Sequence, residues 1–281
     1  MSAAVAERRI WLVADDYGMS PAVSAAIRDL LAHGRLSATS VMMASPGCDD
    51  AAAQSLAALR EAGKPIAIGL HVTLTGPFRP LTRNFAPLRD GAFLPLAPLM
   101  ARALLGRLDP APFAAEIAAQ LAAFTAAFGR PPDYVDGHQH AQLMPTVRDA
   151  FLDAVKTAAP HAWVRQCGMG APPLRRLADP KGLLLDGLSR GFRTRAAARG
   201  IATNPAFAGT YDFSATRPLG ELFAGFFAGL PDGGVVMCHP GEVDDALRRL
   251  DPVTDQRARE YAFLAGDAFA DLLQAQDVAL R

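Results

Sequence analysis

The chain has 281 residues, of which 51% are hydrophobic and 20% are charged, and its 28 basic side chains balance its 28 acidic ones. This length and composition are typical of a globular protein with a large core. The balanced charge argues against a general attraction to nucleic acid or to an anionic membrane surface.

Strands and helices are predicted to alternate along the chain. Short apolar or β-branched runs, bounded by Gly, Pro or Asp, predict strands at 10–14, 36–45, 66–74, 134–137, 162–166 and 233–239. Capping residues and helical periodicity predict the helices between them. One helix starts with Ser20 as its N-cap and Pro21 at its first position, and others are expected at 50–62, 112–128, 145–158 and 257–274.

Two stretches depart from this alternation. Residues 76–112 are rich in Pro, Leu and Arg without clear periodicity, and we expect such an insertion to form a lid or a substrate loop. Residues 170–200 show only weak periodicity. Because the chain has no linker composition and no internal repeat, it is predicted to be a single α/β domain over residues 1–281. Its parallel sheet, covered by helices, would be either open or closed into a barrel.

Neither the start of the chain nor its cysteines indicate an extracellular protein. The opening residues lack the apolar segment of a secretory signal, and no run of about 20 apolar residues is free of Gly, Pro or charge. Cys48, Cys167 and Cys238 show neither a disulfide framework nor metal-ligand spacing. We therefore expect a cytoplasmic protein in which the cysteines act as small apolar side chains.

Aspartate and histidine side chains follow four of the expected strands, close to the point where each strand ends. They are Asp15 and Asp16, His71, Asp136 with His138 and His140, and His239. The carboxyl ends of parallel strands meet at one rim of a sheet or barrel, so these side chains are expected to lie close together. The two remaining histidines, His33 and His161, are predicted to lie on the surface.

One carboxylate and two imidazoles make a ligand set suited to Zn²⁺, Mn²⁺, Fe²⁺, Co²⁺ or, less typically, Mg²⁺. Three protein ligands leave positions for water and substrate, which is typical of a catalytic metal that lowers the pKa of a bound water. Adjacent strand residues point in different directions, so one Asp of the pair could bind the metal while the other acts as general base. A histidine across the site could then act as the acid.

The motifs ADDYG, GLHVTLT, DGHQH followed by MPTVRDAF, and VVMCHPGEVD occur in this order between Val13 and Asp244. As a set they resemble the YdjC-like (ChbG-like) carbohydrate deacetylases. The resemblance implies a deformed (β/α) barrel of the polysaccharide-deacetylase-like type. It also implies removal of an N-acetyl group from a small amino sugar, such as an N-acetylglucosamine unit of a chitooligosaccharide. One divalent metal ion, Mg²⁺ or Zn²⁺, is implied as cofactor, and a homodimer is one option.

Matched motif by motif, the resemblance assigns Asp16, His71 and His138 as metal ligands. It assigns Asp15 as the catalytic base and His239 as the acid. Arg165 falls where the family has an arginine beside the active site, which either orients the base or holds substrate.

Four further residues are candidates for substrate contact, namely His140, Gln142, Phe207 and Tyr211. Gln142 stands where the family has a third histidine, and an amide can form hydrogen bonds but cannot carry a proton. If that histidine sets substrate choice, the specificity of this chain differs. Phe207 and Tyr211 lie in a family-like segment, and core packing is the alternative for both.

Two other functions are compatible with the same residues. The site could hydrolyse another amide or a phosphoester, because a metal would perform similar work there. A non-catalytic, metal-dependent sugar-binding relative is the second alternative, although such a protein would need neither a base nor an acid.

Overall fold

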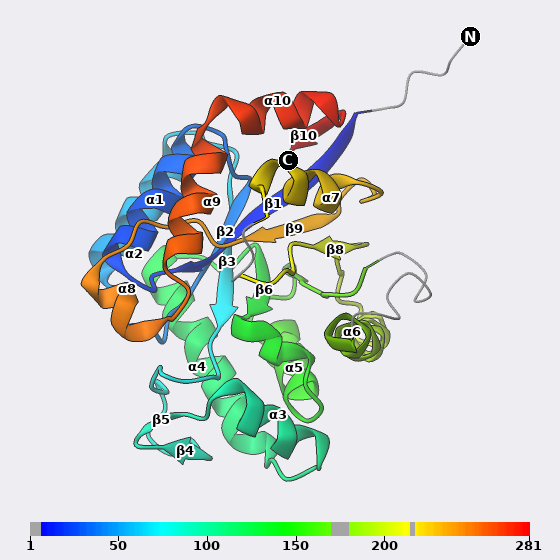
Figure 1. Cartoon of the computed structure of the whole chain (residues 1–281). Helices are drawn as coiled ribbons and strands as arrows, with labels where there is room; N and C mark the ends of the chain where they lie inside the picture. The colour runs from blue at the N-terminus through cyan, green and yellow to red at the C-terminus, as the bar shows by residue number, and fades with distance from the viewer. Residues whose placement is uncertain (1–6, 170–179, 214–216) are drawn as a thin grey trace.

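The computed structural model describes residues 7–169, 180–213 and 217–281. At its centre a curled, parallel eight-stranded sheet runs in the order β7-β6-β3-β2-β1-β9-β8, and β10 pairs with the start of β1 (Figure 1). This confirms the predicted parallel α/β architecture. The strands are β1 (Arg8–Tyr17), β2 (Ala38–Val41), β3 (Ala67–Val72), β6 (Tyr134–Gly137), β7 (Trp163–Val164), β8 (Phe207–Ala208), β9 (Val235–Cys238) and β10 (Val278–Leu280).

Helices surround the sheet, and the predicted caps begin several of them. The Ser20 side chain accepts a hydrogen bond from the Val23 amide, and that of Asp49 accepts one from the Ala52 amide. Such caps satisfy amides that have no partner within the helix. The helices are α1 (Pro21–Ala32), α2 (Asp50–Glu61), α3 (Leu96–Leu104), α4 (Pro110–Phe128), α5 (Val147–Ala158), α6 (Pro180–Ala198), α7 (Leu219–Phe227), α8 (Asp245–Leu250), α9 (Asp255–Ala265) and α10 (Asp267–Ala275).

The sheet is closed irregularly between its two end strands. Val164 of β7 forms an isolated parallel bridge to Thr203, ahead of β8. Next to it, the Asn204 side chain accepts a hydrogen bond from the Gln166 amide (2.9 Å) and donates one to the Gln166 carbonyl (3.1 Å). A side-chain amide thus substitutes for regular strand pairing at this point. The expected deformed (β/α) barrel is therefore confirmed.

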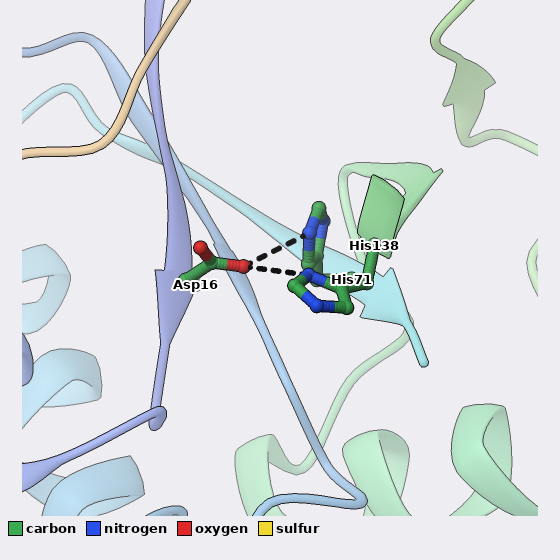
Figure 2. Close-up of side chains that lie close together, drawn as sticks. All are labelled: Asp16, His71 and His138. Carbon is green, nitrogen blue, oxygen red and sulfur yellow. Dashed lines mark hydrogen bonds and ion pairs between the residues drawn. The ribbon is translucent and has the colours of Figure 1, made fainter. Parts of the chain in front are cut away.

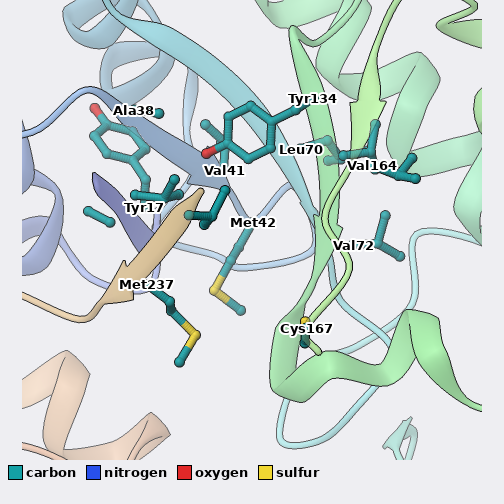
Figure 3. Close-up of a cluster of buried hydrophobic side chains, with 14 of the residues drawn as sticks. Tyr17, Ala38, Val41, Met42, Leu70, Val72, Tyr134, Val164, Cys167 and Met237 are labelled. Carbon is teal, nitrogen blue, oxygen red and sulfur yellow. The ribbon is translucent and has the colours of Figure 1, made fainter. Parts of the chain in front are cut away.

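Apolar side chains of the parallel strands fill the core, including Tyr17, Val41, Leu70 and Val164 (Figure 3). The ring of Tyr134 stacks on Trp163 with 4.6 Å between the ring centres. A β-carbon added to Gly69 would lie 2.5 Å from the Tyr134 ring, so only glycine fits at this position of β3.

Two predictions need correction, for the last helix and for the second strand, and one strand was missed. The 257–274 helix is two helices, because Gly266 leaves the helical region (φ −79°, ψ 166°) between α9 and α10. No strand was predicted at β10, which has three residues and a partner at the other end of the chain. Of the strand expected at 36–45, only Ala38–Val41 pairs with both neighbours.

Residues 76–112 are less irregular than predicted. They contain a hairpin of β4 (Leu88–Arg89) and β5 (Ala92–Phe93), helix α3, and the first residues of α4, which begins at Pro110. These elements are too short to show a period in the sequence. The segment is fixed by Glu116 of α4, a fully buried carboxylate that accepts hydrogen bonds from the Leu81 and Thr82 amides (3.0 and 2.9 Å).

Helix α4 has the composition of a possible membrane span but packs against the rest of the protein. Helix α4 is, among the described residues, the one helix long and apolar enough to cross a membrane. It packs against α2, α5 and β3, and its buried Glu116 and Gln120 form hydrogen bonds within the protein. These contacts are typical of a helix that covers the sheet.

In the weakly periodic 170–200 stretch, α6 forms from Pro180 onward, and 170–179 lie outside the described residues.

Candidate metal centre and active site

Three of the predicted ligands meet at the carboxyl ends of β1, β3 and β6 (Figure 2). Asp16 Oδ1 lies 3.3 Å from His71 Nε2 and 3.0 Å from His138 Nδ1. All three side chains are buried, and their ligand atoms lie within 4.8 Å of one another. The structure therefore brings together the three residues that the sequence selected as metal ligands.

The backbone of β1 presents Asp15 and Asp16 in a way that strand alternation alone does not describe. Asp16 has a φ of +69°, in the left-handed region, and the pairing with β2 shifts register between Ala14 and Tyr17. Aspartate tolerates this conformation better than most residues. This irregularity, a form of β-bulge, lets both neighbouring carboxylates be buried at the same rim, 2% and 1% exposed.

His138 reaches the site through a similarly unusual backbone. The next two residues, Gln139 and His140, have φ of 53° and 58° inside the short 3₁₀ helix η1 (His138–Leu143). The ring of His138 has Phe78 against it, with 5.6 Å between the ring centres. Phe78 belongs to the 76–112 segment, so this segment supplies a wall of the ligand cluster.

Asp15 is held by Arg165, which lies at the end of β7. The two terminal guanidinium nitrogens of Arg165 each lie 2.6 Å from one carboxylate oxygen of Asp15, and Arg165 is 0% exposed. One of these nitrogens also lies 3.1 Å from Asp136 Oδ2. Of the two roles left open for Arg165, contact with the predicted base is the one that the geometry displays.

The sequence predicts Asp136 at the rim but does not indicate its role. Its Oδ1 atom lies 2.6 Å from His71 Nδ1, and the Ser40 hydroxyl lies 3.1 Å from the same nitrogen. A carboxylate on one nitrogen of a histidine fixes the ring and leaves the other nitrogen for a metal. The position of Asp136 directly after a strand, two residues before His138, is the signal that pointed to it.

Helix α9 contributes two charged residues that sequence reasoning missed. Arg257 donates to Asp16 Oδ2 at 2.6 Å, across 241 residues of sequence. Glu260 accepts a hydrogen bond from the backbone amide of His239 at 2.6 Å and another from the Tyr211 hydroxyl. No sequence spacing relates a residue of a C-terminal helix to the first strand, so only the packing of α9 reveals these contacts.

His239 lies at the end of β9 and is half-buried. Its ring stands edge-on to Phe213, with 5.1 Å between the ring centres, and among the described residues its Nδ1 atom has no hydrogen-bond partner. Burial lowers the pKa of His239, and Arg257 acts in the same direction against the carboxylates of Asp16 and Asp15.

For both aspartates, neighbouring arginine and histidine side chains lower the pKa more than burial raises it. Burial alone would raise the pKa of Asp15, but Arg165 and His71 hold this pKa below its usual value. Burial also opposes ionisation of Asp16, and here Arg257 and His138 hold the pKa well below its usual range. For His71, burial would lower the pKa, but Asp136 and Asp15 raise it to about 10, so a metal that binds Nε2 would have to displace a proton.

Three of the four candidates for substrate contact lie close to Arg165 or Cys167, namely Gln142, Phe207 and His140. Gln142 is fully buried and donates to the Arg165 carbonyl at 3.2 Å, while Phe207 is 1% exposed, with the Arg165 guanidinium 5.7 Å from its ring centre. The core-packing alternative therefore describes the surroundings of Phe207. His140 is half-buried between Phe207 and Cys167, and burial lowers its pKa to about 3.

Tyr211 has a different setting. Its hydroxyl contacts Glu260 and accepts from the Gln256 side chain at 2.9 Å. The residue also lines a cavity of about 300 Å³ together with Thr210, Asp212, Arg217, Leu222 and Phe226.

The cysteines behave largely as expected. Cys167 and Cys238 are buried and Cys48 is half-buried. Burial raises the pKa of Cys167 and of Cys48 to about 12, so both remain thiols.

Of two groups of possible metal ligands in the described part of the chain, one is better suited to a divalent cation. Asp136 occupies His71 Nδ1 and Arg257 occupies Asp16 Oδ2, so the atoms left facing one another are His71 Nε2, Asp16 Oδ1 and His138 Nδ1. A second group, Asp15 with His71 and Asp136, also has ligand atoms within 4.8 Å of one another. There, however, both oxygens of Asp15 are already taken by Arg165. The first group is therefore the better metal site.

The curled parallel sheet is a deformed (β/α) barrel with Asp and His residues gathered at its rim. The profile of the YdjC-like protein family matches residues 9–275, and the chain belongs to this family. A chitooligosaccharide deacetylase of Yersinia enterocolitica is 34% identical over 141 residues, which cover 50% of this chain and 53% of that protein. The chain thus spans about half the length of the curated relatives it matches.

Solved structures share the fold. A proposed cellobiose-phosphate cleavage protein of Enterococcus faecalis V583 superimposes with a TM-score of 0.73 at 20% identity, over 98% of this chain and 97% of the other. A peptidoglycan N-acetylglucosamine deacetylase superimposes with a TM-score of 0.50 at 9% identity, over 97% of this chain and 85% of the other. At these identities the likeness concerns the fold alone.

Proposed function

We propose that this protein is a metal-dependent hydrolase that removes the N-acetyl group from a small amino sugar, such as an N-acetylglucosamine unit of a chitooligosaccharide. The observation that carries the proposal is a carboxylate, Asp15, fixed by Arg165 directly beside the cluster of Asp16, His71 and His138. The family and the name of the Yersinia relative give the substrate class.

Each residue has a separate task in this reaction. Asp16, His71 and His138 would hold one divalent cation, Mg²⁺ or Zn²⁺, which when bound would polarise the acetyl carbonyl and acidify water. Asp15, kept ionised by Arg165, accepts the proton of the attacking water. His239, directly after strand β9, which pairs with β1, delivers a proton to the leaving nitrogen. The products are acetate and the free amine.

The remaining parts of the proposal concern the setting of the enzyme. The balanced charge suits a small neutral sugar better than nucleic acid or a membrane surface, and we place the protein in the cytoplasm as a single domain, with a homodimer as one option. Segment 76–112 borders the site through Phe78 and is the proposed lid or substrate wall. Of the four candidates for substrate contact, His140 and Tyr211 are the proposed substrate side, while Gln142 and Phe207 are buried.

The decisive experiment incubates the metal-loaded protein with N-acetylated chitooligosaccharides and measures free acetate. The expected result is acetate release that stops when a chelator removes the metal. No acetate from any N-acetylated amino sugar would overturn the proposal. Phosphate release from a sugar phosphate, or opening of a cyclic amide, in place of acetate release would show that the same site performs a different hydrolysis.

A further inference from the structure

Arg257 connects the proposed metal ligand Asp16 to a second carboxylate. The same terminal nitrogen of Arg257 lies 2.6 Å from Asp16 Oδ2 and 2.6 Å from Asp251 Oδ2. Its Nε donates to the Val253 carbonyl at 3.2 Å, and the side chain is 2% exposed. Asp251 is fixed in turn, because its Oδ1 accepts from the Val253 amide at 2.9 Å.

This arrangement restricts how Asp16 can bind a cation. A free carboxylate can offer one or both oxygens to a metal, and it can rotate between these modes. Here Arg257 takes Oδ2, while Oδ1 faces His71 and His138. Asp16 has a left-handed backbone (φ +69°), and regular strand pairing does not fix this residue. The hydrogen bond from Arg257 is therefore more important for its orientation.

Asp251 reduces the repulsion between the Arg257 guanidinium and a cation bound at Asp16. A lone guanidinium beside a metal ligand would repel the cation, and the repulsion is strong in a buried site where the effective dielectric constant is low. The carboxylate of Asp251 offsets this charge. The pair can therefore donate a hydrogen bond to Asp16 with little net positive charge.

We propose that Arg257, with Asp251 as its charge partner, is a positioning residue that holds Asp16 as a single-oxygen metal ligand. This inference rests on the proposed metal site of Asp16, His71 and His138 but not on the identity of the sugar. It assigns helix α9, which has no residue in the ligand cluster, a direct part in setting the metal affinity.

The test loads the full chain with Co²⁺ and compares the wild type with Arg257→Met, Arg257→Lys and Asp251→Asn. Visible absorption reports the coordination of Co²⁺, and titration calorimetry gives its Kd. Arg249→Met is the matched control, because Arg249 is an exposed arginine on the neighbouring helix α8. Circular dichroism establishes that each variant is folded.

For Arg257→Met we expect a changed Co²⁺ spectrum and a Kd raised by about 10–100-fold, the usual effect of losing a residue that supports a metal ligand. Arg257→Lys should recover part of the loss. Asp251→Asn should raise the Kd several-fold while the spectrum stays closer to that of the wild type. If Arg257→Met does not fold, the Kd of Asp251→Asn becomes the test of the inference. Arg249→Met should match the wild type.

A folded Arg257→Met protein with wild-type spectrum and Kd would overturn the inference, and so would tighter Co²⁺ binding. If Arg257→Met does not fold, an unchanged Kd in Asp251→Asn would also overturn it. Failure of acetate release with normal Co²⁺ behaviour would remove the proposed substrate and leave the inference standing. A wild-type protein that takes up no Co²⁺ would overturn both.

Discussion

Replacing Asp15 with Asn tests the division of labour between the two neighbouring aspartates. The substitution keeps the shape of the side chain and removes the charge that faces both nitrogens of Arg165 at 2.6 Å. Breaking a buried ion pair typically costs about 3–5 kcal/mol of folding free energy. Arg165 keeps a second partner in Asp136 at 3.1 Å, so we expect the low end of this range.

The catalytic effect should be larger than the effect on stability. General-base catalysis contributes about 10²–10⁴-fold to rate, so Asp15→Asn should lower turnover by at least about 100-fold. The metal content should stay near that of the wild type, because Asp16, His71 and His138 are unchanged. Acetate release gives the rate, elemental analysis gives the metal content, and thermal denaturation shows that the variant is folded.

A matched control is available in Asp133, a carboxylate that pairs with Arg60 and Arg130 and lies before β6, outside the ligand cluster. Asp133→Asn should lose stability without losing turnover. Turnover of Asp15→Asn within about tenfold of the wild type would refute its assignment as base. Loss of metal in Asp15→Asn would instead show that Asp15, and not Asp16, is the ligand.

Four further substitutions have defined outcomes. His71→Ala and His138→Ala should each abolish metal binding, measured by elemental analysis after dialysis, and metal retained in both would remove the site as described. Asp136→Asn should weaken metal binding by about 10–100-fold in calorimetry, because this carboxylate orients His71, and an unchanged Kd would contradict that role. Gly69→Ala should destabilise the fold by about 1–3 kcal/mol in denaturant unfolding, since the new methyl group would overlap the Tyr134 ring, and a neutral effect would mean that the ring can move.

The rim of Asp and His residues was predictable because it depends on local features. Apolar runs mark the strands, and the first polar residues after them mark the rim, so His71 and His138 could be located without a structure. Whether Asp15 or Asp16 faces the histidines was a harder question. Strand alternation separates the two side chains, but the left-handed backbone at Asp16 decides the actual directions.

Predictions were weaker where elements are short or depend on remote partners. The 76–112 segment was expected to be irregular, yet it contains a hairpin and α3, a helix of nine residues. A buried glutamate on α4 holds the Leu81 and Thr82 amides of this segment. The break between α9 and α10 falls at Gly266, inside a stretch with continuous helical character. Glycine is a poor helix former, so the break at Gly266 is local, whereas the 76–112 segment depends on a contact with a remote residue.

The sequence by itself determined the parallel α/β architecture, the family, and the residues at the carboxyl ends of the strands. The architecture follows from periodicity, the rim residues follow from residue types at fixed local spacings, and the family follows from the resemblance of the motifs. Only the tertiary structure decided what supports them, namely Arg165 on Asp15, Asp136 on His71, and Arg257 on Asp16 across 241 residues. The physical reason is that burying a charge requires a partner, and packing, not sequence distance, selects which charged side chain can reach it.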